Sequence, residues 1–203
     1  MNIKSLSNKS IDFIIKRFSE LIALVLIFSS ILLLISLISY SPEDPNFIFP
    51  ENIEIKNILG FKGSFVSDIF FQSIGLISIF VSITIFFIGI NLFKKKKFLI
   101  IIENLFYTVL YCILGSLFFE IYYPESFWLI INGNGGFVGK FFESSFLLNI
   151  INLNEKISYY ALILLSLFFF LISTNFNVIF FINLFKKKFT LNKNIKQSEI
   201  NLE

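Results

Sequence analysis

The feature that most constrains this chain is an uninterrupted uncharged run of 25 residues, at positions 69–93. A helix of that length extends about 37 Å and can cross the roughly 30 Å hydrocarbon core of a bilayer. Three further apolar stretches, at 21–39, 98–119 and 157–185, are of similar length. Only 15% of the chain is charged, against about 25% in soluble domains. We therefore predict an all-α membrane protein with four transmembrane helices.

Lysine and arginine are distributed unevenly around these spans. Thirteen of the seventeen lie in residues 1–20, in the loop at 94–97, or beyond residue 185. The other two loops contain only Lys56, Lys62, Lys140 and Lys156. Because cytoplasmic segments are enriched in Lys and Arg, both termini are predicted inside and these two loops outside. The basic clusters are expected to contact anionic lipid headgroups rather than DNA.

This pattern divides the chain into three parts. Residues 1–20 are predicted to form a cytoplasmic tail, and residues 21–189 a four-span membrane domain. Residues 190–203 are polar and are expected to begin a cytoplasmic linker or tail.

The first outer loop opens with a proline-bounded acidic corner, YSPEDP, at residues 40–45. Pro42 and Pro45 cannot continue a helix, and the acids between them resist entry into lipid, so the first span should end here. Tyr40 suits the membrane interface. The apolar run before the corner is longer than that of a secretory signal, and we expect it to remain as an uncleaved span.

The second outer loop repeats parts of the first. YSPE at 40–43 is similar to YYPE at 122–125, and GFKGSF at 60–65 is similar to GFVGKF at 136–141. The chain is either a parallel repeat of two helical hairpins or shows a chance similarity in a Phe-rich sequence. The segment at 139–153 either lies as a helix on the outer surface or begins the fourth span.

Nothing in the sequence indicates catalysis. Histidine is absent, and the single cysteine, Cys112, lies in a predicted span and cannot form an intrachain disulfide. The segment GNGGFVGK departs from a phosphate-binding loop, because Asn134 replaces a required glycine and Phe141 a required Ser or Thr. We predict no enzymatic activity, no cofactor and no metal site.

Glu103 is the one acid well inside a predicted span, and such acids often couple to proton or ion movement. We favour a structural role, in which Glu103 reaches the inner interface or pairs with Lys96 and orients its helix. Small and weakly polar residues also follow helical spacing, which predicts packing faces within the bundle or between subunits. They are Gly75, Ser78, Ser82 and Gly89; Asn104, Thr108, Cys112 and Ser116; and Ser166, Ser173 and Asn177.

These features occur in an order that resembles the N-terminal four-span membrane domain of the FtsK/SpoIIIE family of bacterial DNA translocases. The similarity covers residues 20–190 and is carried by LISYSPEDPNF, ILGFKGSFVSDIFFQSIGLISIF and GNGGFVGKFFESSF. It includes the FQxxG motif at the start of span two and GGxxG before span four. The candidate structural or interaction residues are Tyr40, Ser41, Pro42, Asp44, Pro45, Gly60, Gly63, Asp68, Gln72, Gly75, Glu103, Gly136 and Gly139.

The resemblance implies a non-enzymatic anchor and assembly domain in the bacterial inner membrane, at the division septum. It further implies a hexamer, contacts with other division proteins and a part in chromosome segregation. The motor ATPase, through which such proteins act on DNA, is not among these 203 residues. The chain is therefore expected to be an N-terminal piece or a stand-alone anchor. The alternatives are a small transporter or channel subunit and, with less support, a membrane enzyme.

Overall fold

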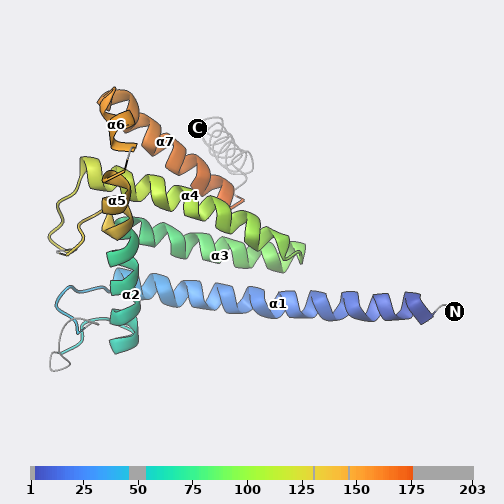
Figure 1. Cartoon of the computed structure of the whole chain (residues 1–203). Helices are drawn as coiled ribbons and strands as arrows, with labels where there is room; N and C mark the ends of the chain where they lie inside the picture. The colour runs from blue at the N-terminus through green and yellow to red at the C-terminus, as the bar shows by residue number, and fades with distance from the viewer. Residues whose placement is uncertain (1–2, 46–53, 130, 146, 176–203) are drawn as a thin grey trace, which may run out of the picture.

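The computed structural model describes residues 3–45, 54–129, 131–145 and 147–175, and the regular elements in these ranges are all helical (Figure 1). Four stretches are long and apolar enough to cross a membrane: Ile11–Ile38, Gly60–Lys95, Leu99–Tyr122 and Glu155–Ser173. The helices are α1 (Ile3–Ile38), α2 (Gly60–Ile74), α3 (Ser78–Lys95), α4 (Leu99–Tyr122), α5 (Gly136–Glu143), α6 (Leu147–Asn152) and α7 (Glu155–Ser173), with a 3₁₀ turn at Gly75–Ile77. The prediction of an all-α four-span membrane protein is confirmed.

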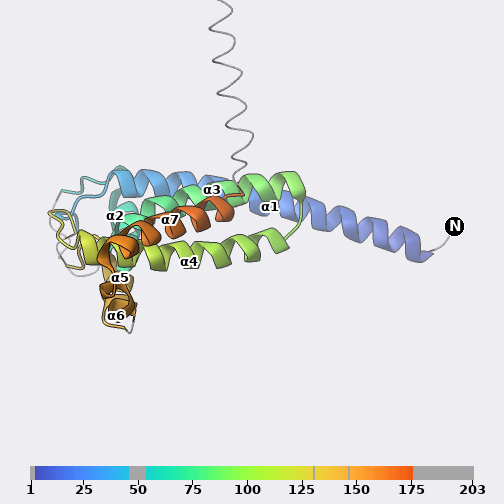
Figure 2. The same ribbon diagram turned by 90° about the horizontal axis from the view of Figure 1, so that it is seen from above.

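Helices α1, α3, α4 and α7 form the bundle, with α1 packed on α3 and α7 packed on α4 (Figures 1 and 2). The α1–α3 contact is close because α3 carries Gly89 where it meets α1. A Cβ added to Gly89 would lie 2.7 Å from the Ile27 side chain and 3.0 Å from the Ala23 carbonyl oxygen. The ring of Phe170 fixes α7 by edge-on contacts with Phe80 and Tyr111, at centroid distances of 5.1 and 5.6 Å.

The predicted packing faces lie inside this bundle. Ser78 and Ser82 of α3 are buried, as are Asn104, Thr108 and Ser116 of α4. Several of their hydroxyl groups donate to carbonyl oxygens of their own helix, which satisfies them without a partner helix. These residues of α3 and α4 are therefore buried within one chain, whereas Cys112 of α4 and Ser166 of α7 are half-buried. Asn177 lies outside the described residues.

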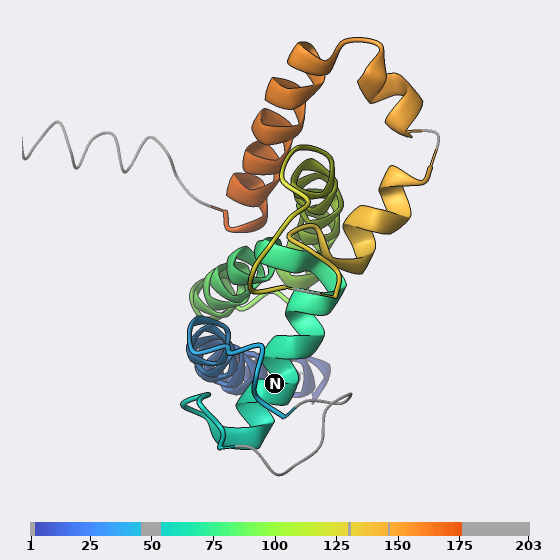
Figure 3. The same ribbon diagram turned by 90° about the vertical axis from the view of Figure 1, so that its left-hand side faces the viewer.

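The two ends of the bundle differ in character. The beginning of α1, the four lysines at the end of α3 and in the loop after it, and the end of α7 lie at one end, which we call the lysine end (Figure 1). At the opposite end, α2 and α5 run across the direction of the bundle helices (Figure 3). We call α2 and α5 together the crossbar, and this end the crossbar end.

The expected spans and the helices differ in three places. The run at 69–93 is not one straight helix, because residues 69–74 belong to α2 and the chain turns at Gly75 before α3 begins. Residues 3–20, expected as a tail, continue α1. The fourth span, expected at 157–185, coincides with α7 up to Ser173. Its remainder from residue 176, and the linker predicted at 190–203, lie outside the described residues.

At the lysine end, Glu20 of α1 binds two basic side chains. Its carboxylate accepts from Arg17 at 2.6 Å and forms an ion pair with Lys96, which ends α3 in the left-handed conformation at φ 54°. The proposed pairing of Lys96 with Glu103 is therefore wrong. Lys96 is drawn to α1 instead, while Glu103 lies on the exposed face of α4 and makes no ion pair within the described ranges.

Two asparagines attach the end of α7 to its neighbours at the same end. The Asn175 amide donates to Asn104 Oδ1 at 2.7 Å, and the Asn91 amide donates to the Thr174 carbonyl oxygen at 3.0 Å. Both bonds join residues far apart in the sequence, so α7 is fixed to α3 and α4 by polar contacts in addition to its aromatic rings.

Candidate functional site

The acidic corner that follows α1 is organised by Asp44, whose exposed fraction is only 1%. Its two carboxylate oxygens accept the backbone N–H groups of Lys56 and Asn57, each at 2.8 Å. Bonds to an ionised acceptor are stronger than neutral ones. Asp44 therefore ties the beginning of the first loop to the segment that leads into α2.

Two other residues of the corner, Ser41 and Pro45, accept hydrogen bonds that stabilise it. Ser41 accepts the Asp44 N–H through its carbonyl oxygen at 3.2 Å, which closes the turn around Pro42. The carbonyl oxygen of buried Pro45 accepts the Ser64 hydroxyl of α2 at 3.0 Å. The corner thus contacts both its own turn and the first part of the crossbar.

Asn57, which sequence reasoning missed, joins the end of α1 to the start of α2. Its amide nitrogen donates to the carbonyl oxygens of Ser36 and Ser39, at 2.9 and 3.3 Å. The last carbonyls of a helix lack partners within the helix, so Asn57 satisfies groups that would otherwise be unpaired. Gly63 allows this approach, since a Cβ there would lie 2.2 Å from Asn57 Oδ1.

A second polar cluster lies where α1 meets α2. Tyr40 donates its hydroxyl to Asp68 Oδ1 at 3.3 Å, and Gln72 donates to the same oxygen at 3.4 Å. The Tyr40 ring also packs on Phe71, with centroids 4.9 Å apart. Burial, and then the charge of Asp68, raise the pKa of the Tyr40 hydroxyl above its ordinary value. The hydroxyl therefore stays protonated and remains a donor to Asp68.

The crossbar is joined at its centre by two glycines from different motifs. Gly75 of FQxxG has φ 61° and ψ −146°, a conformation that essentially only glycine adopts. A Cβ there would lie 1.9 Å from the Asn134 carbonyl oxygen, which accepts the Leu76 N–H at 3.0 Å. Gly136, with φ 65°, faces it: a Cβ on Gly136 would lie 2.5 Å from the Gly75 nitrogen. The backbones of the two motifs are thus in direct contact, which we call the glycine junction.

The carbonyl end of α2 is satisfied at this junction by groups from three other elements. The Ser78 hydroxyl binds the Phe70 carbonyl at 2.9 Å, and the Asn132 amide binds that of Gln72 at 3.1 Å. The Ser116 hydroxyl of α4 binds the Ile74 carbonyl at 2.9 Å. Asn132 and the role of Ser116 were not foreseen from sequence. These bonds fix the direction in which the chain leaves α2.

Two glycines let α5 rest directly on α4. A Cβ on Gly139 would lie 2.6 Å from the Ser116 carbonyl oxygen, and one on Gly135 would lie 2.7 Å from both the Ser116 oxygen and Glu120. Close backbone approach is a common reason for glycine at a helix contact. GGxxG thus places Gly136 on the glycine junction and Gly135 and Gly139 on α4.

The motif residues are therefore brought together by the structure, with two exceptions. Gly60 begins α2 at φ 66° but has open space where a Cβ would stand, so only its conformation favours glycine. Glu103 lies on α4 near the lysine end, far along the helix from the crossbar. Within the described ranges no group of three or more His, Cys, Asp or Glu residues could hold a metal ion.

Comparison with known protein families identifies the family to which this chain belongs. The family described as the 4TM region of DNA translocase FtsK/SpoIIIE matches residues 15–186. The chain belongs to this family. No curated protein and no solved structure matches it. The resemblance inferred from the motifs is confirmed, and the glycine junction is how this FtsK/SpoIIIE 4TM region brings its FQxxG and GGxxG segments into contact.

Proposed function

We propose that this chain is the membrane-anchoring and assembly region of an FtsK-like DNA translocase, acting in cell division and chromosome segregation. The observation that carries the proposal is the family match over residues 15–186. The motor ATPase, and with it any contact with DNA, would be supplied by sequence outside these 203 residues.

We place the lysine end in the cytoplasm and the crossbar end outside a bacterial inner membrane. The support is that two segments rich in positive charge, the first part of α1 and the lysines at 94–97, lie at the same end of the bundle. A motor attached beyond α7 would then lie on the side of the membrane that holds the chromosome.

We propose that the chain assembles with copies of itself and with other division proteins. The family resemblance suggests that the assembly of copies is a hexamer. Because most of the small residues on α3 and α4 are buried, we expect contacts between copies to use outward faces. One such face on α4 carries Ile102, Phe106 and Val109, which are 67%, 62% and 53% exposed. Lipid or a neighbouring copy would cover it.

Orientation is tested by labelling cells with a membrane-impermeant maleimide. Cys112, the one native cysteine, is first changed to Ser, and then Glu125→Cys at the crossbar end and Lys95→Cys at the lysine end serve as a matched pair. We expect intact cells to label the variant at position 125 and only permeabilised cells to label that at position 95. The reverse pattern would invert the orientation.

Location is tested by microscopy of a fusion with a fluorescent protein after residue 203. The proposal requires a band at mid-cell in dividing cells, with intact fusion shown by immunoblot. A uniform envelope signal from intact fusion would contradict the division role and favour another membrane function, such as that of a transporter subunit. Native mass measurement in lipid discs checks assembly, and a monomer at cellular density would contradict it.

A further inference from the structure

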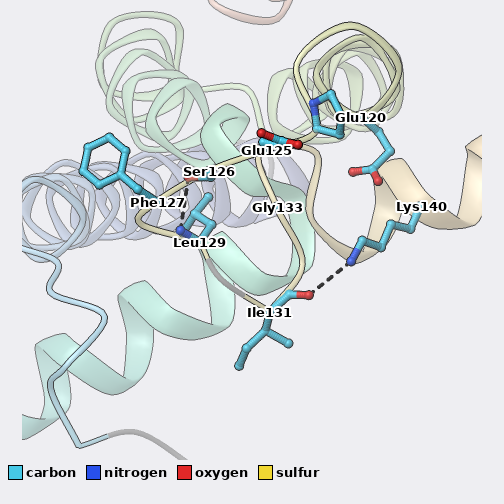
Figure 4. Close-up of a pocket in the computed structure, with 9 residues that line it drawn as sticks. Glu120, Glu125, Ser126, Phe127, Leu129, Ile131, Gly133 and Lys140 are labelled. Carbon is cyan, nitrogen blue, oxygen red and sulfur yellow. Dashed lines mark hydrogen bonds between the residues drawn. The ribbon is translucent and has the colours of Figure 1, made fainter.

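A cavity of about 730 Å³ opens at the crossbar end, between the end of α4, the loop that follows it, and α5. Its lining includes Glu120, Pro124, Glu125, Leu129, Ile131 and Lys140 (Figure 4). This volume is within the usual size range of small-ligand sites. We call it the outer cavity.

Glu120 is the residue in this cavity that most needs a partner. It is only 8% exposed, and its Oε2 atom is buried with no hydrogen-bond donor. Oε2 is buried because the backbone of Gly135 lies close to it. A Cβ on Gly135 would lie 2.7 Å from Oε2. A buried carboxylate oxygen without a donor is costly. Glu120 also lines the outer cavity, so a ligand in the cavity would lie beside its side chain.

The nearest polar groups are already engaged. Lys140 directs its ammonium away from Glu120 and donates to the Ile131 carbonyl oxygen at 3.1 Å (Figure 4). The Ser126 hydroxyl oxygen accepts the N–H groups of Trp128 and Leu129, at 3.2 and 3.1 Å. Neither residue donates to the Glu120 carboxylate, and no ion pair of the described residues includes it.

The remaining walls define what would fit beside this carboxylate. Glu125 is exposed and adds a second negative charge. Leu129 and Ile131 provide apolar surface, while the ring of Phe127, which is 83% exposed, points away from Glu120 (Figure 4). Acid and alkyl surfaces together match a positively charged nitrogen group carried on a hydrocarbon stem.

We propose that the outer cavity binds an alkylguanidinium or alkylammonium group, with Glu120 as its principal counter-ion and Glu125 as a secondary one. The group has two chemical sources: a free diamine or guanidine, or an Arg or Lys side chain on another protein. Binding by the purified chain does not depend on the proposed function, so the two ideas can fail separately.

The test uses the single tryptophan of the chain as the reporter. Trp128 neighbours the cavity, because its ring contacts that of Phe127 at a centroid distance of 5.3 Å. The full chain in lipid discs is titrated with agmatine, which carries a guanidinium and an ammonium on one butyl stem, while Trp128 emission is recorded. We expect a saturable change, and no such change with pentanol, which has a similar stem without the charge.

Two glutamine variants on the same helix separate this site from general charge effects. Glu120→Gln should weaken agmatine binding at least about tenfold, since the negative charge that strengthens the hydrogen bond is lost. Glu103→Gln removes an acid near the opposite end of α4 and should leave binding unchanged. Circular dichroism and thermal unfolding confirm that both variants fold. Glu125→Gln, at an exposed position, should weaken binding by a smaller factor and provides a variant that cannot fail through core packing.

The absence of a saturable change in the unmodified chain would overturn the proposal. Equal affinity in the unmodified chain and Glu120→Gln would overturn it as well. A photo-cross-linking residue at position 127 then identifies the source in cells. A cross-linked peptide with Arg or Lys beside the attachment point, lost in Glu120→Gln, assigns the site to a partner protein. If agmatine binds but no Glu120-dependent cross-link is found, the site is assigned to a free cation.

Discussion

Replacing Gly75 with alanine should be among the most damaging single-methyl changes in this protein. At φ 61° and ψ −146°, a residue with a side chain is strained by ~1–3 kcal/mol. The added Cβ would also stand 1.9 Å from the Asn134 carbonyl oxygen, so the loop before α5 must move. Such overpacking costs ~1–3 kcal/mol, and the Leu76–Asn134 hydrogen bond is weakened. We expect a loss of about 3–5 kcal/mol in the free energy of unfolding.

The matched control is Gly60→Ala. Gly60 has nearly the same φ, 66°, but no atom lies within 4 Å of its added Cβ. It should therefore suffer the conformational penalty alone, about 1–2 kcal/mol. Gly75→Ala should therefore be the more damaging change, because only Gly75 combines a positive φ with a close backbone contact.

The measurement is equilibrium unfolding of purified protein in mixed micelles with a rising fraction of sodium dodecyl sulfate. Far-UV circular dichroism and Trp128 emission report helix content and the loop at the crossbar end. If Gly75→Ala and Gly60→Ala were destabilised equally, backbone contact at the junction would not contribute, and the reasoning would be refuted.

Three further changes test the polar contacts at the crossbar end. Asp44→Ala leaves two backbone N–H groups without their charged acceptor and should lower the unfolding free energy by ~2–4 kcal/mol, with Asp44→Asn less affected in the same micelle assay. Ser116→Ala removes one donor to the Ile74 carbonyl and should cost about 1 kcal/mol, and a loss above about 3 kcal/mol would contradict its assignment as a single bond. The hydrogen bond from Lys56 lowers the pKa of Glu43 in the folded protein below its ordinary 4.5, so this ion pair stabilises the fold above that value and is lost on acidification. The unfolding temperatures of Glu43→Gln and the unmodified chain should therefore differ slightly at neutral pH and converge as the pH falls through the lowered pKa of Glu43, and a difference that grows in acid would give the wrong sign.

The number of spans could be predicted because it depends on quantities that the sequence displays directly. Each crossing helix needs a long apolar run, and charged residues mark where such runs stop. The third run, predicted at 98–119, differs from α4 by only a few residues at its end. The family could also be predicted, because its motifs are short, ordered and placed at span ends.

The division of the run at 69–93 could not be predicted from hydropathy. No charge separates residues 69–74 from α3, and an apolar helix lying across the bundle has the same composition as one that crosses the membrane. Gly75 was noticed as a small residue, but its meaning depends on Asn134 and Gly136, about 60 residues away. A contact between two backbones leaves no pattern in hydropathy or charge.

Glu120 and Glu103 show that the burial of a carboxylate could not be predicted from the sequence. Glu103 drew attention because it interrupts an apolar run, yet it is exposed on α4. The predicted span at 98–119 leaves Glu120 in an outer loop, yet this residue is 8% exposed because Gly135 and Gly139 bring α5 onto it. Whether a carboxylate is buried depends on the elements that fold over it, and those are distant in the sequence.

The glycine junction also limits how this protein can recover from mutation. Where two side chains meet, an enlarged residue on one side can be compensated by a smaller residue on the other. At the junction, Gly75 and Gly136 touch through main-chain atoms, and no amino acid is smaller than glycine. A genetic selection that starts from a defective Gly75 variant should therefore yield true reversion, or second changes in the loop at 131–135. Second changes at position 136 should not appear among the suppressors.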